Sequence, residues 1–182
     1  MKVLFAIDDV VLDTTPALVD EYNRVYRDSF RWEDVTTIPF YDSLPKLSSS
    51  QEAEYFLKSF ANTGGYERIP FVRFAKKSLA YLQSQYRVGF ISARPSSEQE
   101  AVMRVFSKHK VSSDSVFTHS ASLLAASIQP EYWFDESSAR LDVVQQQSPR
   151  TQTYLFSRPW NACSETNYPR VSTWVDVLRR IS

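Results

Sequence analysis

The sequence has a single cysteine, Cys163, so no internal disulfide bond can form. Such sparing use of cysteine is typical of proteins in a reducing compartment, and we expect a cytoplasmic location. An excess of one charge is also missing, because 21 Lys and Arg residues balance 21 Asp and Glu residues. Zero formal charge gives no electrostatic reason to bind nucleic acid or an anionic membrane surface, so neither is expected as a partner.

Long hydrophobic runs are absent as well. The first run, residues 3–7, stops at Asp8 and Asp9 and is too short for a signal-peptide core or a membrane span. No later run approaches the roughly 20 apolar residues that cross a bilayer. Because apolar residues still make up 43% of the chain and aromatic residues 14%, a globular domain with a real core is expected.

Short apolar segments alternate with helical patterns along most of the chain. Strands are predicted at residues 3–7, 86–91, 115–118, 132–134 and 153–156. Helices are predicted from a cap at Thr14 onward and at residues 50–61, 71–82, 96–108, 120–127, 137–146 and 172–181. This alternation indicates an α/β fold, with a mainly parallel sheet and helices on both of its faces.

Residues 29–70 interrupt the alternation. They contain three prolines, many aromatic residues and the pair Gly64 and Gly65, which indicates a turn or hinge. We interpret residues 14–70 as a small, mostly helical insertion, and residues 1–13 together with 71–182 as the α/β core. Most of the aromatic side chains in the insertion are expected to form a small core of their own.

Polar residues follow three of the predicted strands. They are Asp8 and Asp9 after the first strand, Ser92 after the second, and Asp135 and Glu136 after the strand at 132–134. In a parallel sheet these positions meet at the edge where ligands bind. Each residue alone reads as an ordinary polar strand end, but the three sets in order favour a cradle for Mg²⁺, which prefers oxygen ligands, and for phosphate.

These segments resemble the motifs of the haloacid dehalogenase (HAD) superfamily. The similar runs are VLFAIDDV (3–10) for the first motif, FIS (90–92) for the second and FDE (134–136) for the fourth. SARP (92–95) and YLFSRPWN (154–161), with Arg170 and Trp174, are similar to the 5'(3')-deoxyribonucleotidase branch. The resemblance covers nearly the whole chain, and it implies a Rossmann-like HAD core with a parallel sheet flanked by helices, plus a small helical cap at 14–70.

The resemblance also implies roles for single residues. In the superfamily the first Asp of the first motif attacks phosphorus and the second is the general acid and base, which puts these positions at Ala6 and Asp8. Phosphate would be bound at Ser92, Ala93 and Arg94. The implied cofactor is Mg²⁺.

The implied metal ligands are Asp8, Asp135 and Glu136. The implied partner is a nucleotide or another phosphorylated small molecule, whose base could stack on aromatic side chains of the cap. Apart from the resemblance, Asn161 is expected to order a loop near the site by bonding backbone groups.

Two departures from the motifs put catalysis in doubt. The nucleophile position holds Ala6, whose methyl group can neither attack phosphorus nor bind a metal, and the segment 120–127 lacks the lysine of the third motif. Removing a nucleophile lowers a rate on the order of 10⁴- to 10⁶-fold. One engineered replacement would explain Ala6 alone, so two losses favour a natural loss of catalysis.

Three functions therefore compete. The first is a catalytically impaired protein that acts by binding a nucleotide, a phosphate group or a protein partner. The second is an active Mg²⁺-dependent 5'-nucleotidase of deoxyribonucleoside monophosphates whose nucleophile was replaced by Ala6. The third is a purely structural interaction protein in which the pocket is vestigial.

Other polar residues have weaker claims to a role. Arg94 is as compatible with a surface salt bridge as with phosphate binding, and Asp13 is expected to shape the turn from strand to helix. His109 and His119 have no partner motif, so neither is expected to be catalytic.

Overall fold

The computed structural model describes residues 2–47, 49–94, 98–112, 115–117 and 120–181. The described strands are β1 (Lys2–Ala6), β2 (Arg87–Ser92), β3 (Ser115–Phe117), β4 (Tyr132–Asp135), β5 (Gln152–Phe156) and β6 (Arg170–Val171). The described α-helices are α1 (Thr14–Tyr26), α2 (Ser50–Asn62), α3 (Ala75–Gln85), α4 (Gln99–Lys108), α5 (Ala121–Ile128), α6 (Ser138–Gln147) and α7 (Trp174–Ile181).

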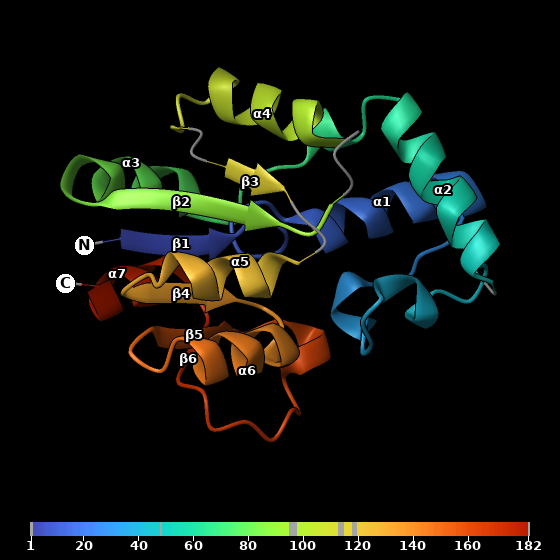
Figure 1. Cartoon of the computed structure of the whole chain (residues 1–182). Coiled ribbons are helices and arrows are strands. Elements are labelled where there is room, and N and C mark those ends of the chain that lie inside the picture. The colour runs from blue at the N-terminus through green and yellow to red at the C-terminus, as the bar shows by residue number, and fades with distance from the viewer. Residues whose placement is uncertain (1, 48, 95–97, 113–114, 118–119, 182) are drawn as a thin grey trace.

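The described strands form one parallel sheet in the order β3–β2–β1–β4–β5–β6 (Figure 1). This confirms the α/β fold that the alternating pattern predicts. Strand β6 has only two residues and was not predicted, because so short a segment shows no periodicity. The predicted ends at residue 118 of the strand 115–118 and at residues 96–97 of the helix 96–108 lie outside the described residues.

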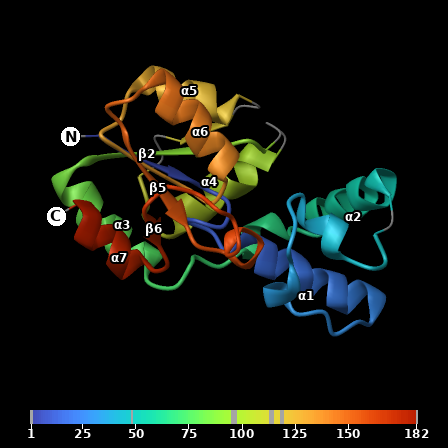
Figure 2. The same ribbon diagram turned by 90° about the horizontal axis from the view of Figure 1, so that it is seen from below.

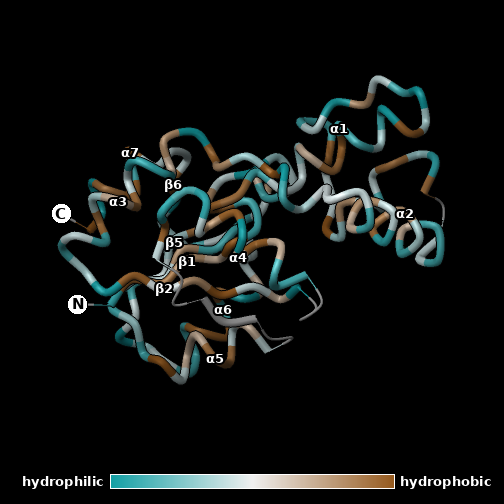
Figure 3. Tube along the Cα trace, turned by 90° about the horizontal axis from the view of Figure 1, so that it is seen from above, coloured by the Kyte–Doolittle hydropathy of each residue, from teal (hydrophilic) through white to brown (hydrophobic). Residues whose placement is uncertain are grey.

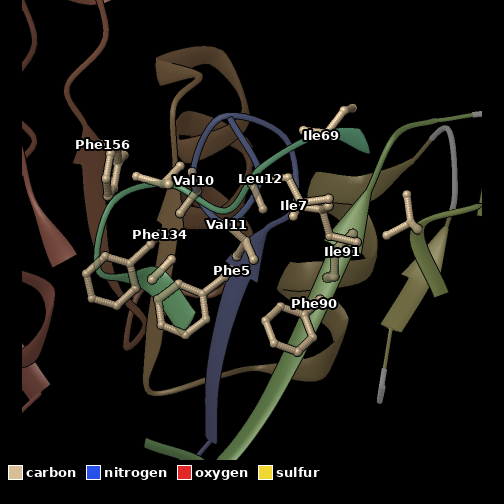
Figure 4. Packing of buried hydrophobic residues seen from close by; sticks show 14 of the residues in the cluster. Phe5, Ile7, Val10, Val11, Leu12, Ile69, Phe90, Ile91, Phe134 and Phe156 are labelled. Atoms are coloured by element: carbon tan, nitrogen blue, oxygen red, sulfur yellow. The ribbon is translucent and has the colours of Figure 1, made fainter. Parts of the chain in front are cut away.

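One face of the sheet carries a row of aromatic side chains. The ring of Phe5 stacks on Phe134 at 5.1 Å and lies 6.4 Å from Phe90, between centroids (Figure 4). Two helices cover this row: Trp174 of α7 packs 4.9 Å from Phe5, and Phe106 of α4 packs 4.9 Å from Phe90. Strand β1 is buried on both faces, which explains its continuous rather than alternating apolar sequence.

Helices α5 and α6 pack on one face of the sheet, and α3 and α7 on the other (Figure 2). Because successive side chains of a strand point to opposite faces, Ala6 and Trp133 face away from the aromatic row. Both line a small cavity together with Ala121 of α5 and Arg140 of α6. The polar ends of β1, β2 and β4 therefore meet the starts of α5 and α6 on this side of the sheet.

The starts of several helices differ from the predicted ones. Helix α1 begins at Thr14, with Asp13 in the cap position, so the prediction of Thr14 as the cap is wrong. Helix α2 is capped by Ser49, whose hydroxyl accepts a hydrogen bond from a backbone N–H of the first turn at 3.2 Å. Helix α3 starts at Ala75 and not at 71, because Phe74 before it is left-handed, with φ of 68°.

Helices α1 and α2, with the 3₁₀ turns η1 (Trp32–Asp34), η2 (Phe40–Ser43) and η3 (Tyr66–Arg68), lie to one side of the sheet (Figure 1). Each helix alternates hydrophobic and hydrophilic segments, as Figure 3 shows, and turns its apolar side chains inward. Ring centroids lie 5.0 Å apart in the pairs Tyr22–Tyr26 and Phe60–Tyr66. These rings pack against one another within the segment, but its buried aromatic residues belong to the same hydrophobic cluster as the core of the sheet, so the prediction of a separate small core is not confirmed.

The pair of glycines follows α2 in a tight turn. Gly64 has φ of 68°, a conformation that glycine adopts without strain. A Cβ atom on Gly65 would lie 2.4 Å from the ring of Phe60, so a side chain there would collide with this buried ring. The glycine pair thus forms the predicted turn and permits a close approach of the backbone to an aromatic ring.

Two hydrogen bonds join the chain where it leaves and re-enters the core. The N–H of Asp13 donates to the carbonyl of Pro70 at 2.8 Å, and the N–H of Val72 donates to the carbonyl of Val11 at 2.9 Å. The division at 13/14 and 70/71 stays a prediction, and these bonds hold its two sides together. In the described ranges, no helix combines the length and the apolar character needed to cross a membrane.

Candidate functional site

The carboxyl ends of β1, β2 and β4 lie side by side, because Ala6 pairs with Ile91 in β2 and Phe5 pairs with Phe134 in β4. They enclose a cavity of about 50 Å³. Its walls include all but one of the site residues proposed from the sequence, namely Ala6, Asp8, Ser92, Ala93, Asp135 and Glu136. The exception is Arg94, which contacts Asp8 beside the cavity.

Asp8 is held by three side chains. Its carboxylate accepts hydrogen bonds from Thr14 Oγ1 at 2.9 Å, Ser92 Oγ at 3.0 Å and Arg94 Nε at 2.7 Å. A second nitrogen of Arg94, Nη2, completes a bidentate ion pair with Asp8. Burial alone would raise the pKa of Asp8, but the charge and hydrogen bonds of Arg94 outweigh it and lower that pKa below the ordinary value. Asp8 is therefore fixed as a carboxylate.

Arg94 is itself buried and held from several sides. Its Nη2 also donates to Thr14 Oγ1 at 2.9 Å, and its guanidinium lies 4.6 Å from the centroid of the Tyr66 ring in the cap. Its Nη1 is buried and has no hydrogen-bond partner among the residues that the structure describes. Of the two alternatives that the sequence left open, Arg94 does form a salt bridge, but a buried one, with 8% of the residue exposed. Its phosphate-binding role stays a prediction.

Asp135 and Glu136 share one arginine that the sequence did not single out. Arg140 Nε donates to the two carboxylate oxygens of Asp135 at 3.1 and 2.9 Å, and Nη2 donates to Oδ1 of Asp135 at 2.7 Å. The same Nη2 lies 2.5 Å from Oε1 of Glu136. Burial of Arg140 would lower its pKa, but the two carboxylates raise that pKa above the ordinary value.

The second oxygen of Glu136, Oε2, is buried and has no partner in the described part of the chain. Burial raises the pKa of Glu136 well above its ordinary value, and the charge of Asp135 adds to the rise, while Arg140 opposes it. Glu136 therefore keeps its proton to a higher pH than an exposed glutamate does. Such a carboxyl group is a poor ligand for a cation, because a proton competes for its oxygens.

The residues at this edge do not fit Mg²⁺ in the arrangement that the structure shows. Mg²⁺ needs oxygen ligands in near-octahedral geometry, and Ala6 offers none. Asp8 and Asp135 direct their oxygens at arginine guanidinium groups instead. Among the described residues, no three His, Cys, Asp or Glu side chains gather closely enough to hold a metal ion. The predicted Mg²⁺ site stays a prediction that this geometry does not support.

The segment that lacks a lysine reaches the cavity through Ala121, the first residue of α5. None of the described residues in the cavity wall is a lysine. Ala6 and Ala121 both line the cavity, and neither side chain carries a charge.

Asp9 sits at the turn after β1, and the sequence placed it at the strand edge without a role of its own. Its backbone is left-handed, with φ of 58°. Its carboxylate accepts from the N–H of Thr15 at 2.8 Å and from Thr15 Oγ1 at 2.6 Å, and Arg158 Nε donates to its carbonyl at 2.6 Å. Asp13 joins the same group through Arg158 at 3.1 Å, which agrees with its expected role in the strand-to-helix turn.

Replacing Asp9 with asparagine should change how stability depends on pH. Burial raises the pKa of Asp9 to about 6. A raised folded-state pKa means that the folded protein favours the protonated form of Asp9. The stabilising contribution of this bound proton is nearly full below pH 4 and is lost as the pH rises through 6. Between pH 4 and pH 7.5 the parent should lose about 2 kcal/mol relative to Asp9→Asn. Urea unfolding of both proteins at the two pH values measures this difference. If the free energy of unfolding changed equally with pH in the parent and in Asp9→Asn, the raised pKa of Asp9 would be contradicted.

Asn161 orders the loop beside the site, as predicted. It lies at the end of the 3₁₀ turn η5 (Pro159–Asn161), and its Nδ2 donates to the carbonyls of Glu136 at 2.8 Å and Phe156 at 2.9 Å. His109 lies elsewhere, edge-on to the ring of Phe71 at 5.2 Å, and His119 is outside the described residues. The loop after β5 is therefore tied to the end of β4 through a single amide.

Comparison with known proteins places the fold. No protein-family model and no curated protein matches the chain. A haloacid dehalogenase-like hydrolase from Streptococcus pneumoniae is similar in structure, with a TM-score of 0.70 and 11% identity over 100% of this chain and 98% of that one. A HAD family hydrolase from Deinococcus radiodurans, solved with bound phosphate and sodium, is similar as well. Its TM-score is 0.69, with 10% identity over 99% of this chain and 94% of that one.

A putative β-phosphoglucomutase from Thermotoga maritima is also similar, with a TM-score of 0.66 and 15% identity over 100% of this chain and 99% of that one. The chain therefore has the fold of the HAD-like hydrolases, as the resemblance implies. The finer assignment to the deoxyribonucleotidase branch stays a prediction.

Proposed function

We propose that this chain is a catalytically silent protein of the HAD-like fold that binds a phosphorylated small molecule and does not hydrolyse it. The observation that carries this proposal is the state of the carboxylates at the sheet edge. Position 6 has none, and Asp8 and Asp135 are each paired with an arginine. Of the described carboxyl groups that line the cavity, only Glu136 has an oxygen without a partner, and its raised pKa makes it a poor nucleophile.

The role of general acid and base, which the resemblance gives to Asp8, is also unsupported. A general acid must give up and regain a proton near the working pH, so its pKa should lie near that pH. The pKa of Asp8 is lowered, and its oxygens are occupied by Arg94, Thr14 and Ser92. Asp8 is therefore suited to holding Arg94 in place and not to proton transfer.

Binding of a phosphoryl group has support from the end of β2. The Nη1 group of Arg94 is a buried donor without an acceptor, and a phosphate oxygen is an acceptor of the right charge. The cavity of about 50 Å³ is far smaller than the roughly 300–1,000 Å³ of ordinary ligand pockets. A phosphoryl group at most fits inside, so the rest of the ligand would lie against the cap. The single cysteine supports a cytoplasmic location for this activity.

Hydrolysis and binding can be measured on the same protein. Phosphate release from a panel of deoxyribonucleoside and ribonucleoside monophosphates with MgCl₂ should equal that of a protein-free control. Isothermal titration calorimetry with the same panel and with inorganic phosphate should detect binding of at least one compound. Hydrolysis by the parent protein would refute a silent site, and no binding in either series would favour the purely structural interaction protein.

The alternative is an active Mg²⁺-dependent 5'-nucleotidase in which Ala6 replaced an aspartate. It is favoured by the gathering of Asp8, Ser92 and Asp135 around one cavity. We expect Ala6→Asp alone to remain inactive, because Arg94 and Arg140 still occupy the other two carboxylates. A phosphatase assay that showed even 100-fold activity over background for Ala6→Asp would support the alternative.

A further inference from the structure

Arg140 occupies an electrostatically unfavourable position on its helix. It is the third residue of α6, where Ser137 already caps the helix by accepting from the N–H of Arg140 at 3.4 Å. The start of a helix carries a partial positive charge, so a cation in the first turn is disfavoured. Something other than the helix must therefore hold this guanidinium in place.

The carboxylates of Asp135 and Glu136 supply that attraction. Asp135 is completely buried, and its side chain accepts from Arg140 on both oxygens and from the N–H of Ser137 at 3.0 Å. Both oxygens of Asp135 therefore already accept hydrogen bonds from protein donors. A metal ion at Asp135 would have to displace the guanidinium.

Two carboxylates of this edge each have an arginine partner, and Glu136 shares the second of these arginines. Asp8 is paired with Arg94, and Asp135 with Arg140. A divalent cation added to this set would leave an excess of buried positive charge, and Ala6 provides no further carboxylate to balance it. An isolated buried charge is costly, so the two kinds of cation exclude each other.

We propose that the Arg140 guanidinium is a built-in cation, which pairs with Asp135 and Glu136 in place of a metal ion and lets this edge of the sheet fold without one. The role belongs to folding and site closure, and it does not depend on whether the cavity binds phosphate. It also implies that Arg140 is what keeps divalent cations out. Removing the guanidinium would uncover two adjacent carboxyl groups, and Mg²⁺ is commonly held by one or two such groups with water.

The test compares the parent protein with Arg140→Met, which keeps an apolar stem but loses the charge. The melting temperature of the parent should be the same in EDTA and in 10 mM MgCl₂. In EDTA, Arg140→Met should melt roughly 10 °C lower than the parent, as expected when a buried ion pair loses one partner. MgCl₂ at 10 mM should recover roughly 4 °C of this loss if the Kd is near 1 mM.

Two further variants control the result. Arg179→Met removes an arginine of α7 whose side chain is 75% exposed, and it should melt close to the parent with or without Mg²⁺. The double variant Asp135→Asn/Arg140→Met removes both charges, so it should be more stable in EDTA than Arg140→Met and insensitive to Mg²⁺. If Arg140→Met does not fold in EDTA, its refolding in MgCl₂ together with rescue by the double variant supports the proposal.

Three results would overturn the inference. A rise of several degrees in the parent's melting temperature with MgCl₂ would show that the edge accepts a metal beside Arg140. Equal stability of Arg140→Met and the parent would show that the guanidinium neutralises nothing. Rescue by the double variant without any response of Arg140→Met to Mg²⁺ would refute the replacement of a metal.

Discussion

Replacing Arg94 with methionine is expected to lower the free energy of unfolding by about 3 kcal/mol. The substitution keeps an aliphatic stem under the Tyr66 ring but leaves Asp8 with no opposite charge. The side chain of Asp8 is 26% exposed, so water compensates part of the loss, and the effect should lie at the low end for buried pairs. Urea unfolding at pH 7, followed by tryptophan fluorescence, measures it.

A matched control separates this effect from the loss of any arginine. Arg104 forms an exposed ion pair with Glu67 at 2.8 Å, and Arg104→Met should cost far less, because water screens that pair. The double variant Asp8→Asn/Arg94→Met should be more stable than Arg94→Met alone. Equal costs for Arg94→Met and Arg104→Met would show that the buried pair has no special weight.

Trp174→Ala is expected to lower the free energy of unfolding by about 3 to 5 kcal/mol. The side chain is fully buried against Phe5, and its Nε1 donates to the carbonyl of Val10 at 2.8 Å. The loss therefore combines a cavity under the sheet with an unsatisfied carbonyl in the loop after β1. Because that loop carries Asp8, the variant should also disturb the site.

The hydrogen bond and the packing of Trp174 can be separated. Trp174→Phe keeps most of the ring volume and should lose only about 1 to 2 kcal/mol, from the carbonyl of Val10 left without its donor. Val175→Ala changes the next residue of α7, which is 42% exposed, and should stay within about 0.5 kcal/mol of the parent. Chemical unfolding of all three variants tests this order, and a Val175→Ala effect as large as that of Trp174→Ala would contradict it.

The sheet and the location of the site could be predicted because the signals are local. The apolar run before Asp8 and the order of strands and helices set the core, and the carboxyl edge of a parallel sheet brings Asp8, Ser92 and Asp135 together. None of these steps requires knowing where a long side chain points. Strand ends are fixed by the backbone, so their meeting follows from topology.

The arginine network could not be predicted in the same way. Arg94 and Asp8 lie 86 residues apart, so their ion pair depends on tertiary packing and on a flexible side chain that could equally face solvent. Arg140 had a local signal that went unused, since an arginine in the first turn of a helix five residues after a buried aspartate can reach back to it. An unfavourable charge at a helix start is the feature that would have drawn attention to it.

The hydrogen bonds between residues 11–13 and 70–72 have a consequence for how such a protein can change over time. The chain departs from the sheet and returns to it at a single point, so whatever lies between adds little to the entropy lost in closing the core. Segments of very different size could be exchanged at this junction while the sheet stays intact. The contacts that such an exchange would have to preserve include the Tyr66 ring beside Arg94 and the ion pair of Glu67 with Arg104.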